Sequence, residues 1–270
     1  MINKAGSGHP GGSLSIIDLV MTLYETTLRH NPKKPSWEER DRFILSSGHQ
    51  CPALYTVLAD QGYFAKKHLS TLRTKGSKLQ GHPEYKRLPG IENTSGPLGQ
   101  GYTVAVGKAI AAKRQGKHHC VFCLSSDGEH DEGAVWEAAQ LAAHHQLNNL
   151  CVIIDRNHLQ IDGRTEDSNN LRNLKEKYQA FGFTAVDING HDIDMIKDAL
   201  TYFDCHKSQQ PFCIVAHTHL GKGVSFMENN PVWHGKAPDD EELAMALAEL
   251  KHKAQAAKLH HALQEKGVLR

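Results

Sequence analysis

Short apolar runs alternate along this chain with longer segments in which apolar residues recur at helical spacing. The apolar runs are typical of buried strands and comprise Phe43–Leu45, Val121–Leu124, Leu150–Ile154, Ala185–Ile188 and Phe212–Ala216. The helical segments are Leu14–Leu28, Pro52–Gln61, Gly99–Arg114, Ala134–Gln146 and Ile193–Phe203. Continuous apolar strands separated by helices predict an α/β fold, with a parallel sheet covered by helices on both faces. Ligands of such sheets bind at the carboxyl ends of the strands.

Two segments depart from this alternation. Residues 66–87 are polar and rich in Lys and Arg, and we expect a long excursion at one edge of the sheet. From Pro238 onward, Leu243, Leu247 and Leu250 predict a solvent-facing amphipathic helix that packs on the domain or contacts a partner. Because no repeat or low-complexity linker interrupts the chain, residues 1–270 are expected to form one domain with a helical tail over about 239–266.

Composition narrows the classes of partner and compartment. The 270 residues carry 31 basic and 30 acidic side chains, so nothing favours a nucleic-acid-binding surface. No apolar run is long enough for a membrane span, and the residues from Met1 to Lys4 lack a signal-peptide pattern. The six scattered cysteines are expected to be buried, reduced thiols of a cytoplasmic protein. Cys120 and Cys123 have Cys-x-x-Cys spacing, but without a second pair no zinc site is expected.

Polar residues follow two consecutive predicted strands. Asp127 and Gly128 come after one strand and Asn157 after the next, so adjacent parallel strands would bring them to neighbouring loops. Two such oxygen ligands, with a backbone carbonyl, a diphosphate and water, would form an octahedral shell for Mg²⁺ or Ca²⁺. Glycine also lets a backbone N–H approach phosphate oxygens. Each residue alone reads equally well as a turn residue, and it is the pair that favours a metal–diphosphate site.

Four of the nineteen histidines lie in loops bounded by Gly or Pro: His9, His49, His82 and His234. A lone loop histidine is more often solvent-exposed than functional, but four in the loops of one cleft favour functional roles. The run from Gly96 to Gly101 has glycines spaced like those of a dinucleotide-binding loop. No convincing strand precedes it, so the Rossmann interpretation fails.

Taken together, these segments resemble the thiamine diphosphate-binding part of transketolases, from Lys4 to about Asp240. The first group of matching motifs is Ser126-Asp127-Gly128, Glu132-Gly133-x-x-Trp136-Glu137-Ala138, Asn148-Asn149-Leu150, Asp155-x-Asn157 and Gln160-Ile161-Asp162-Gly163. The second group contains the histidine loops and comprises residues 4–11, 41–49, 81–84, 94–101 and 233–236. The resemblance implies a thiamine diphosphate-binding fold.

The resemblance also implies roles for individual residues. The implied metal ligands are Asp127, Asn157 and the carbonyl of Leu159. The implied cofactor contacts are Gly128 and His49 near the diphosphate, with His234 in reach of it, and Gly96 and Leu98 around the aminopyrimidine. The implied residues of the substrate channel are His9, His82 and His234. Glu132 matches a glutamate that links the two cofactor sites of a dimer, and reads otherwise as a first-turn helix acid.

Three positions depart from the family pattern. Ser126 stands where most members have Gly, and we expect this change to be tolerated. Ser47 replaces a common lysine. Leu220 stands where a basic residue is frequent, which puts one cofactor contact in doubt, although Lys222 is close by.

The residues give no sign of a second domain, whereas a full transketolase continues into one that brings the glutamate acting on the aminopyrimidine and most of the sugar-phosphate contacts. The resemblance therefore implies the N-terminal subunit of a split transketolase that transfers a two-carbon ketol unit between sugar phosphates. A separate C-terminal subunit, in an α₂β₂ assembly, would complete it, although a truncated chain would look the same.

Other classes of protein remain open at this point. They are the α subunit of a 2-oxoacid dehydrogenase, a deoxyxylulose phosphate synthase, and a non-catalytic scaffold with the cofactor-binding fold. Pentose phosphates are the default substrates, with a specialised sugar as the alternative.

Overall fold

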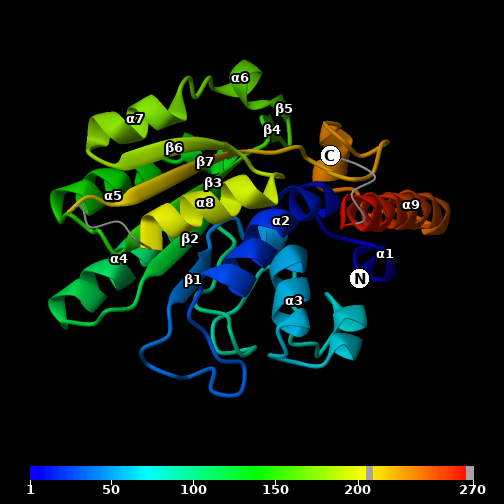
Figure 1. Ribbon diagram of the computed structural model, residues 1–270, viewed down its shortest axis with the longest axis horizontal. Coiled ribbons are helices and arrows are strands. Elements are labelled where there is room, and N and C mark those ends of the chain that lie inside the picture. The colour runs from blue at the N-terminus through cyan, green and yellow to red at the C-terminus, as the bar shows by residue number, and fades with distance from the viewer. Residues whose placement is uncertain (205–208, 266–270) are drawn as a thin grey trace.

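The computed structural model describes residues 1–204 and 209–265 of the chain. Five parallel strands form one sheet in the order β1-β2-β3-β7-β6 (Figure 1). The strands are β1 (Arg42–Leu45), β2 (Val121–Ser126), β3 (Leu150–Arg156), β6 (Thr184–Asn189) and β7 (Phe212–His217). All five predicted strands are confirmed, each slightly longer than its apolar run. The added residues are mostly polar strand ends, which an apolar pattern leaves out.

The five predicted helices are also present. They are α2 (Pro10–Thr26), α3 (Cys51–Asp60), α4 (Gln100–Arg114), α5 (Gly133–His144) and α8 (Ile193–Asp204). Helix α2 begins four residues before the predicted Leu14, with Pro10 in its first turn. Proline suits that position because it has no N–H to leave unpaired. This earlier start places His9 directly before the helix.

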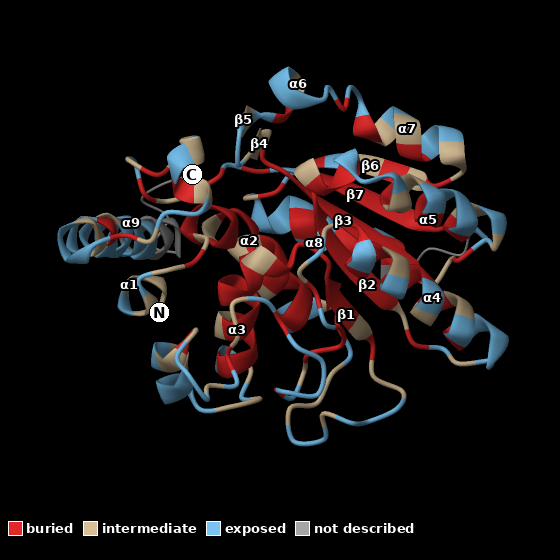
Figure 2. Cartoon of the chain, turned by 180° about the vertical axis from the view of Figure 1, so that it is seen from behind, coloured by how far each residue is buried: buried red, intermediate tan, exposed pale blue. Residues whose placement is uncertain are grey.

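Helices cover both faces of the sheet, as predicted. Phe122 and Leu124 of β2 pack with α2, α3 and α8, whereas Val121 and Cys123 pack with α4, α5 and α7 (Leu174–Phe181). Alternate residues of a strand point to opposite faces, so each strand contributes to two apolar layers. Figure 2 shows the buried sheet in red between helices whose outer surfaces are exposed.

Several short elements were not predicted. They are α1 (Ile2–Ala5), α6 (Thr165–Ser168), α7 (Leu174–Phe181) and an antiparallel hairpin of β4 (Leu159–Gln160) and β5 (Gly163–Arg164). Short 3₁₀ turns cover Gly48–Gln50, Lys66–Thr71, Gly128–Asp131 and Pro231–His234. Apart from α7, which has Leu174, Tyr178 and Phe181 at helical spacing, these elements are too short to show an apolar period.

The tail forms α9 (Asp240–Glu265), which lies beside α1 at one end of the molecule (Figure 1). Asn3 Nδ2 donates to the Pro238 carbonyl at 3.1 Å and to Asp240 Oδ1 at 2.9 Å. Leu247 and Leu250 are exposed and line an apolar groove of about 290 Å³. The expected packing of this helix on the domain continues along its first half, where Ala246 is buried and Glu249 accepts from the Ser225 amide at 2.7 Å.

The described cysteines are mostly buried, as predicted. Cys51, Cys123, Cys151 and Cys213 are buried and Cys120 is half-buried, while Cys205 lies outside the described residues. Burial raises the pKa of the Cys51 thiol to about 12. Within residues 1–204 and 209–265, no helix is both long and apolar enough to cross a membrane.

Candidate functional site

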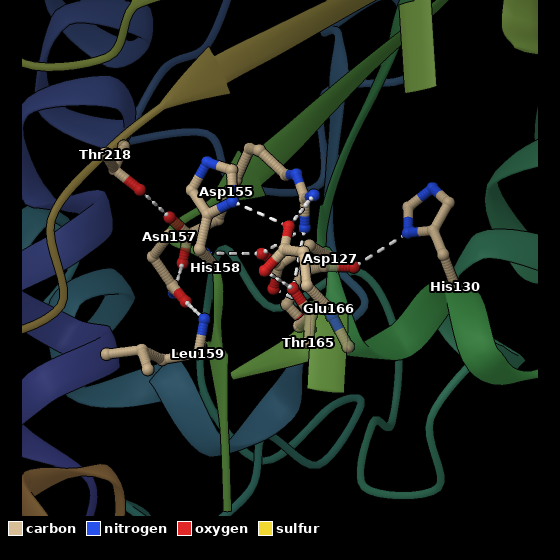
Figure 3. A network of polar contacts seen from close by, with 12 residues as sticks. Asp127, His130, Asp155, Asn157, His158, Leu159, Thr165, Glu166 and Thr218 are labelled. Carbon is tan, nitrogen blue, oxygen red and sulfur yellow. Dashed lines mark hydrogen bonds and ion pairs between the residues drawn. The ribbon is translucent and has the colours of Figure 1, made fainter. Parts of the chain in front are cut away.

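Strands β2 and β3 end side by side at the carboxyl edge of the sheet. Ser126 pairs with Asp155 in the register of the two strands, so the loops that carry Asp127 and Asn157 are neighbours, as predicted. The amide of His158 donates to Asp127 Oδ2 at 2.7 Å, and the amide of Gly128 donates to Asp127 Oδ1 at 2.8 Å (Figure 3). These bonds hold the Asp127 carboxylate between the two loops.

Asp127 is fully buried, and this determines its electrostatics. Desolvation, together with the nearby Asp155 carboxylate, raises the pKa of Asp127 to about 7. The guanidinium of Arg156, 3.1 Å from Oδ2, acts in the opposite direction. A cation bound beside a buried carboxylate offsets the free-energy cost of burying its negative charge. This position therefore suits a divalent metal.

Asp155 is the centre of a second, denser set of hydrogen bonds. Its carboxylate accepts from Ser15 Oγ at 2.6 Å, Gln50 Nε2 at 2.6 Å, Asn157 Nδ2 at 2.9 Å and the hydroxyl of Thr218. Burial raises the pKa of Asp155, and these donors oppose that shift. Asp155 belongs to a sequence motif but had no predicted role; the structure shows that it fixes the orientation of Asn157.

Because Asn157 Nδ2 is held by Asp155, its Oδ1 points the other way and accepts from the Leu159 amide at 2.9 Å. Amide, carboxylate and carbonyl oxygens are the ligands of hard cations such as Mg²⁺ and Ca²⁺. Among the residues that the structure describes, no cluster of three or more His, Cys, Asp or Glu side chains could hold a metal. Any cation bound here would therefore depend on oxygens of Asn157 and Leu159 as well as Asp127.

The predicted site residues converge on one cavity of about 420 Å³ at this edge. The predicted residues that line it are His9, His49, His82, Gly96, Leu98, Gly128, Glu132, Asn157, Leu159 and His234. Asp127 does not line the cavity and lies behind Gly128. One cavity therefore collects residues that lie as far apart in the sequence as His9 and His234.

The four loop histidines form a cluster within this cavity. The ring centroid of His9 is 5.2 Å from that of His49, 6.4 Å from that of His82 and 5.6 Å from that of His234. His49 and His234 are 5.2 Å apart. Nδ1 of His9 and Nδ1 of His234 are buried without a hydrogen-bond partner in the described part of the chain. Buried polar atoms are normally paired, so these nitrogens suit contacts to a bound ligand.

Burial keeps these imidazoles neutral. Desolvation lowers the pKa of His49, His82 and His234, and it lowers the pKa of His9 to about 4 with help from His234, Arg73 and His82. A neutral imidazole has one nitrogen that donates and one that accepts. Each imidazole of the cluster can therefore both donate a hydrogen bond to a sugar hydroxyl and accept one from it.

Glu129 was not singled out from the sequence. It is fully buried, and its Oε1 accepts from the Gly99 amide at 2.7 Å and from Ser46 Oγ at 2.5 Å. Burial raises the pKa of Glu129 to about 7. Glu129 thus ties the start of α4, which follows Gly96 and Leu98, to the end of β1. The one signal in the sequence is its place directly after Asp127-Gly128.

The structure shows the surroundings of the three residues that depart from the family pattern. Ser47 Oγ donates to Gln50 Oε1 at 2.5 Å, so this serine helps to orient the residue that binds Asp155. Leu220 is buried and lines the cavity, and a Cβ on Gly11 would lie 2.7 Å from its Cγ. Leu220 therefore packs against the first turn of α2. Ser126 also lines the cavity.

A larger depression of about 660 Å³ adjoins the first, with Asn157 and Leu159 between them. His158, His217 and His219 line it, but none of the four clustered histidines does. The four histidines singled out from the sequence line the smaller cavity.

Comparison with known proteins identifies relatives of this chain. The family model of the transketolase thiamine diphosphate-binding domain matches residues 1–260. The chain is 41% identical over 251 residues to the 6-deoxy-6-sulfo-D-fructose transketolase subunit SqwG of Clostridium sp. (strain MSTE9), covering 93% of this chain and 90% of that one. It is 40% identical over 249 residues to an apulose-4-phosphate transketolase subunit of Actinobacillus succinogenes, covering 92% and 90%.

A solved structure has the same fold. Transketolase from Campylobacter jejuni superposes with a TM-score of 0.87 at 38% sequence identity. The match covers 93% of this chain and 40% of that one, so this chain corresponds to part of the longer transketolase.

Proposed function

This chain belongs to the transketolase family, as a thiamine diphosphate-binding subunit, and we propose that it transfers a two-carbon ketol unit from a ketose phosphate to an aldose together with a separate C-terminal subunit. The observation that carries the proposal is the single cavity in which four neutral imidazoles meet Gly128, Asn157 and Leu159. Retention of this whole set argues against a non-catalytic scaffold.

The residues present fit the cofactor and its metal. The buried Asp127 carboxylate, Asn157 Oδ1 and the Leu159 carbonyl would hold Mg²⁺ or Ca²⁺, and the Gly128 loop would hold the diphosphate. Gly96 and Leu98 would contact the aminopyrimidine. Thiamine diphosphate, when bound, supplies reversible cleavage of a carbon–carbon bond next to a carbonyl group.

The histidines would serve the sugar. As the C2–C3 bond of the donor breaks, its C3 hydroxyl loses a proton and an aldose leaves. As the new bond to the acceptor carbonyl forms, the new alkoxide takes up a proton. We assign this proton movement and the binding of sugar hydroxyls to His9, His82 and His234, whose lowered pKa values keep them neutral at pH 7. His49 would lie near the diphosphate.

A partner chain is part of the proposal. Two relatives of nearly the same length are named as subunits, which supports a separate C-terminal transketolase chain as the partner of this one. We propose that the partner supplies the glutamate acting on the aminopyrimidine and most sugar-phosphate contacts, in an α₂β₂ assembly.

The names of the relatives provide candidates for the donor sugar. One relative is named for 6-deoxy-6-sulfo-D-fructose and another for apulose 4-phosphate, so a specialised anionic ketose is as suitable a candidate as a pentose phosphate.

The test measures two-carbon transfer to ribose 5-phosphate with thiamine diphosphate and Mg²⁺. Xylulose 5-phosphate, apulose 4-phosphate and 6-deoxy-6-sulfo-D-fructose serve as donors, and the chain is assayed alone and mixed with a C-terminal transketolase subunit. We expect activity only in the mixture. Asp127→Ala should abolish it, because the substitution removes the buried metal ligand, whereas His68→Gln on the distant exposed turn should retain it.

Activity of the chain alone would refute the need for a partner. Conversion of a 2-oxoacid without any ketose transfer would favour the 2-oxoacid dehydrogenase alternative. A mixture that binds no thiamine diphosphate would favour the scaffold.

A further inference from the structure

We propose that Arg156 is a positioning residue that fixes the Asp127 carboxylate and the β4–β5 hairpin in the arrangement that the metal–diphosphate site needs. Its effect on the metal rests on the proposed function, whereas its effect on the hairpin does not. Arg156 is the middle residue of Asp155-x-Asn157, and the sequence motifs predict no role for it.

The guanidinium of Arg156 connects three segments. Its side chain is only 5% exposed. Nη1 donates to Asp127 Oδ2 at 3.1 Å and to Thr165 Oγ1 at 2.9 Å, and Nη2 donates to Glu166 Oε1 at 2.5 Å. The loop after β2 and the first turn of α6 are thus tied to the end of β3. Figure 3 shows Asp127, Thr165 and Glu166 gathered in this network.

His158 closes the network into a ring. Its Nδ1 contacts Glu166 Oε1 at 2.9 Å, and its amide donates to Asp127 Oδ2. The Thr165 amide donates to the His158 carbonyl at 3.1 Å. His158 has a φ of 64°, a left-handed conformation that a non-glycine residue adopts at a cost and that these contacts hold in place.

The β4–β5 hairpin begins and ends at this ring. Its residues follow His158 and precede Thr165, and Leu159, Gln160 and Ile161 line the cofactor cavity. A Cβ on Gly128 would lie 3.2 Å from Gln160 Oε1, so the hairpin lies directly over the glycine loop. A displaced Arg156 would therefore shift one wall of the cavity.

The hydrogen bonds of this ring also determine which oxygen of Asp127 is available to a cation. Oδ2 accepts from both Arg156 and the His158 amide, which uses both of its lone pairs. Oδ1 accepts only from the Gly128 amide among the described residues, so it retains one lone pair for a metal. Arg156 thereby leaves Oδ1 as the oxygen of Asp127 that a cation would use.

Only arginine fits this role. Its planar fork presents several N–H groups at fixed angles, and here two nitrogens serve three acceptors on different segments. A lysine ammonium is a point charge that could neutralise Asp127 without holding α6 in place.

The experiment compares Arg156→Met and Arg156→Lys with Arg42→Met. Arg42 is a matched control because its half-buried side chain forms an ion pair with Glu92, 3.5 Å away, at the opposite end of the sheet. Hydrogen exchange of residues 159–169 is measured in the chain alone. Mn²⁺ binding is measured by electron paramagnetic resonance in the two-subunit complex with thiamine diphosphate.

We expect Arg156→Met to accelerate exchange of the hairpin at least several-fold, and to weaken Mn²⁺ binding roughly 10–100-fold, the usual effect of losing a residue that supports a metal ligand. Arg156→Lys should restore part of the Mn²⁺ affinity but leave the hairpin exchange fast. Arg42→Met should lower the stability of the fold without changing either quantity.

Glu166→Gln provides a variant that keeps the ion pair of Arg156 with Asp127, should Arg156→Met fail to fold. It should accelerate hairpin exchange and weaken Mn²⁺ binding less than Arg156→Met does, because the Asp127 carboxylate stays in place while Leu159 is loosened. Hairpin exchange in the Arg156 and Glu166 variants equal to the wild type, or matched by Arg42→Met, would overturn the proposal. A wild-type complex that binds no Mn²⁺ would instead count against the proposed function, and the exchange comparison would still decide the role of Arg156.

Discussion

At the scale of single residues, burial shifts acids and bases at the carboxyl edge in opposite directions. The pKa values of Asp127 and Glu129 rise to about 7, and those of His9 and His130 fall to about 4. Desolvation is the largest cause in all four cases, because it disfavours whichever form is charged. Burial at this edge therefore favours the neutral form of all four side chains.

The effect of burial on the pKa of His130 can be measured through the pH dependence of stability. It is buried, with Nδ1 2.8 Å from the Ser126 carbonyl and Nε2 2.9 Å from the Tyr178 hydroxyl. Because its pKa is lowered in the fold, the unfolded chain binds the proton first as pH falls below about 6.5. The stability that neutral His130 contributes is thus fully present above that pH and is lost toward pH 4.

We predict that His130→Gln makes the free energy of unfolding less sensitive to acid. One proton corresponds to about 1.4 kcal/mol per pH unit, so the wild type should lose roughly 2 kcal/mol more than the variant between pH 6.5 and 5. Urea unfolding at several pH values measures this difference. The raised pKa values of Asp127 and Glu129 act in the opposite direction, but they are common to both proteins. Parallel pH profiles would exclude His130 as the titrating group.

At the scale of elements, the contact of α4 with the end of β1 depends on a missing side chain. A Cβ on Gly101 would lie 2.5 Å from Ser46 Cα and 2.7 Å from Ser46 Oγ. The amide of Tyr102 donates to Ser46 Oγ at 2.8 Å, so α4 approaches β1 closely at this point. Backbone atoms cannot move aside cheaply, so only glycine fits here.

We predict that Gly101→Ala lowers the free energy of unfolding by about 1–3 kcal/mol, the usual cost of overpacking, and displaces the loop that carries Gly96 and Leu98. Gly107→Ala on the same helix is the control, because its Cβ would meet nothing within 4 Å. There the better helix propensity of alanine should raise the free energy of unfolding by about 1 kcal/mol. A general effect on helix stability would change the free energy of unfolding of both variants in the same direction. If both variants lost a similar amount of stability, the packing argument would be contradicted.

The elements found from sequence share one property, which is a repeated apolar period. Strands such as Val121–Ser126 are buried on both sides and read directly from the pattern. The β4–β5 hairpin and α6 were missed because they are short and polar, whereas the two turns of α7 do carry an apolar period that was overlooked in the sequence. Glu129 and Arg156 were missed for a related reason, since a charged side chain reads as exposed unless its partners, such as Ser46 or Glu166, are known to lie nearby. These partners come from other segments, and only the folded chain brings them together.

The histidine loops were found from the sequence without any help from the apolar pattern. Nothing in the apolar pattern places His9 beside His234, yet the family motifs predicted one cleft and the structure gathers all four histidines within it. The roles assigned to these histidines and to the metal ligands remain predictions, because proximity alone does not establish chemistry.

At the scale of the whole molecule, the cavity lined by the four loop histidines lies at the carboxyl edge, and Glu132 lines it from an exposed position. Glu132 is the N-cap residue of α5, but its side chain makes no capping hydrogen bond. It therefore contributes little to the fold of a single chain. An exposed carboxylate at the rim of a cavity is suited to contact a second copy of the site, as proposed for the α₂β₂ assembly.

We predict that Glu132→Gln leaves the free energy of unfolding of the isolated chain within about 0.5 kcal/mol of the wild type, as is usual for surface substitutions. In the complex with the C-terminal subunit, the same change should weaken thiamine diphosphate binding and shift sedimentation toward species smaller than α₂β₂. Glu137→Gln, exposed one turn further along the same helix, is the matched control and should affect neither quantity. If the two variants behave alike in the complex, Glu132 lies outside the contact between cofactor sites. A loss of stability already in the isolated Glu132→Gln chain would instead return this residue to the role of an ordinary first-turn acid of α5, whose charge favours the helix N-terminus.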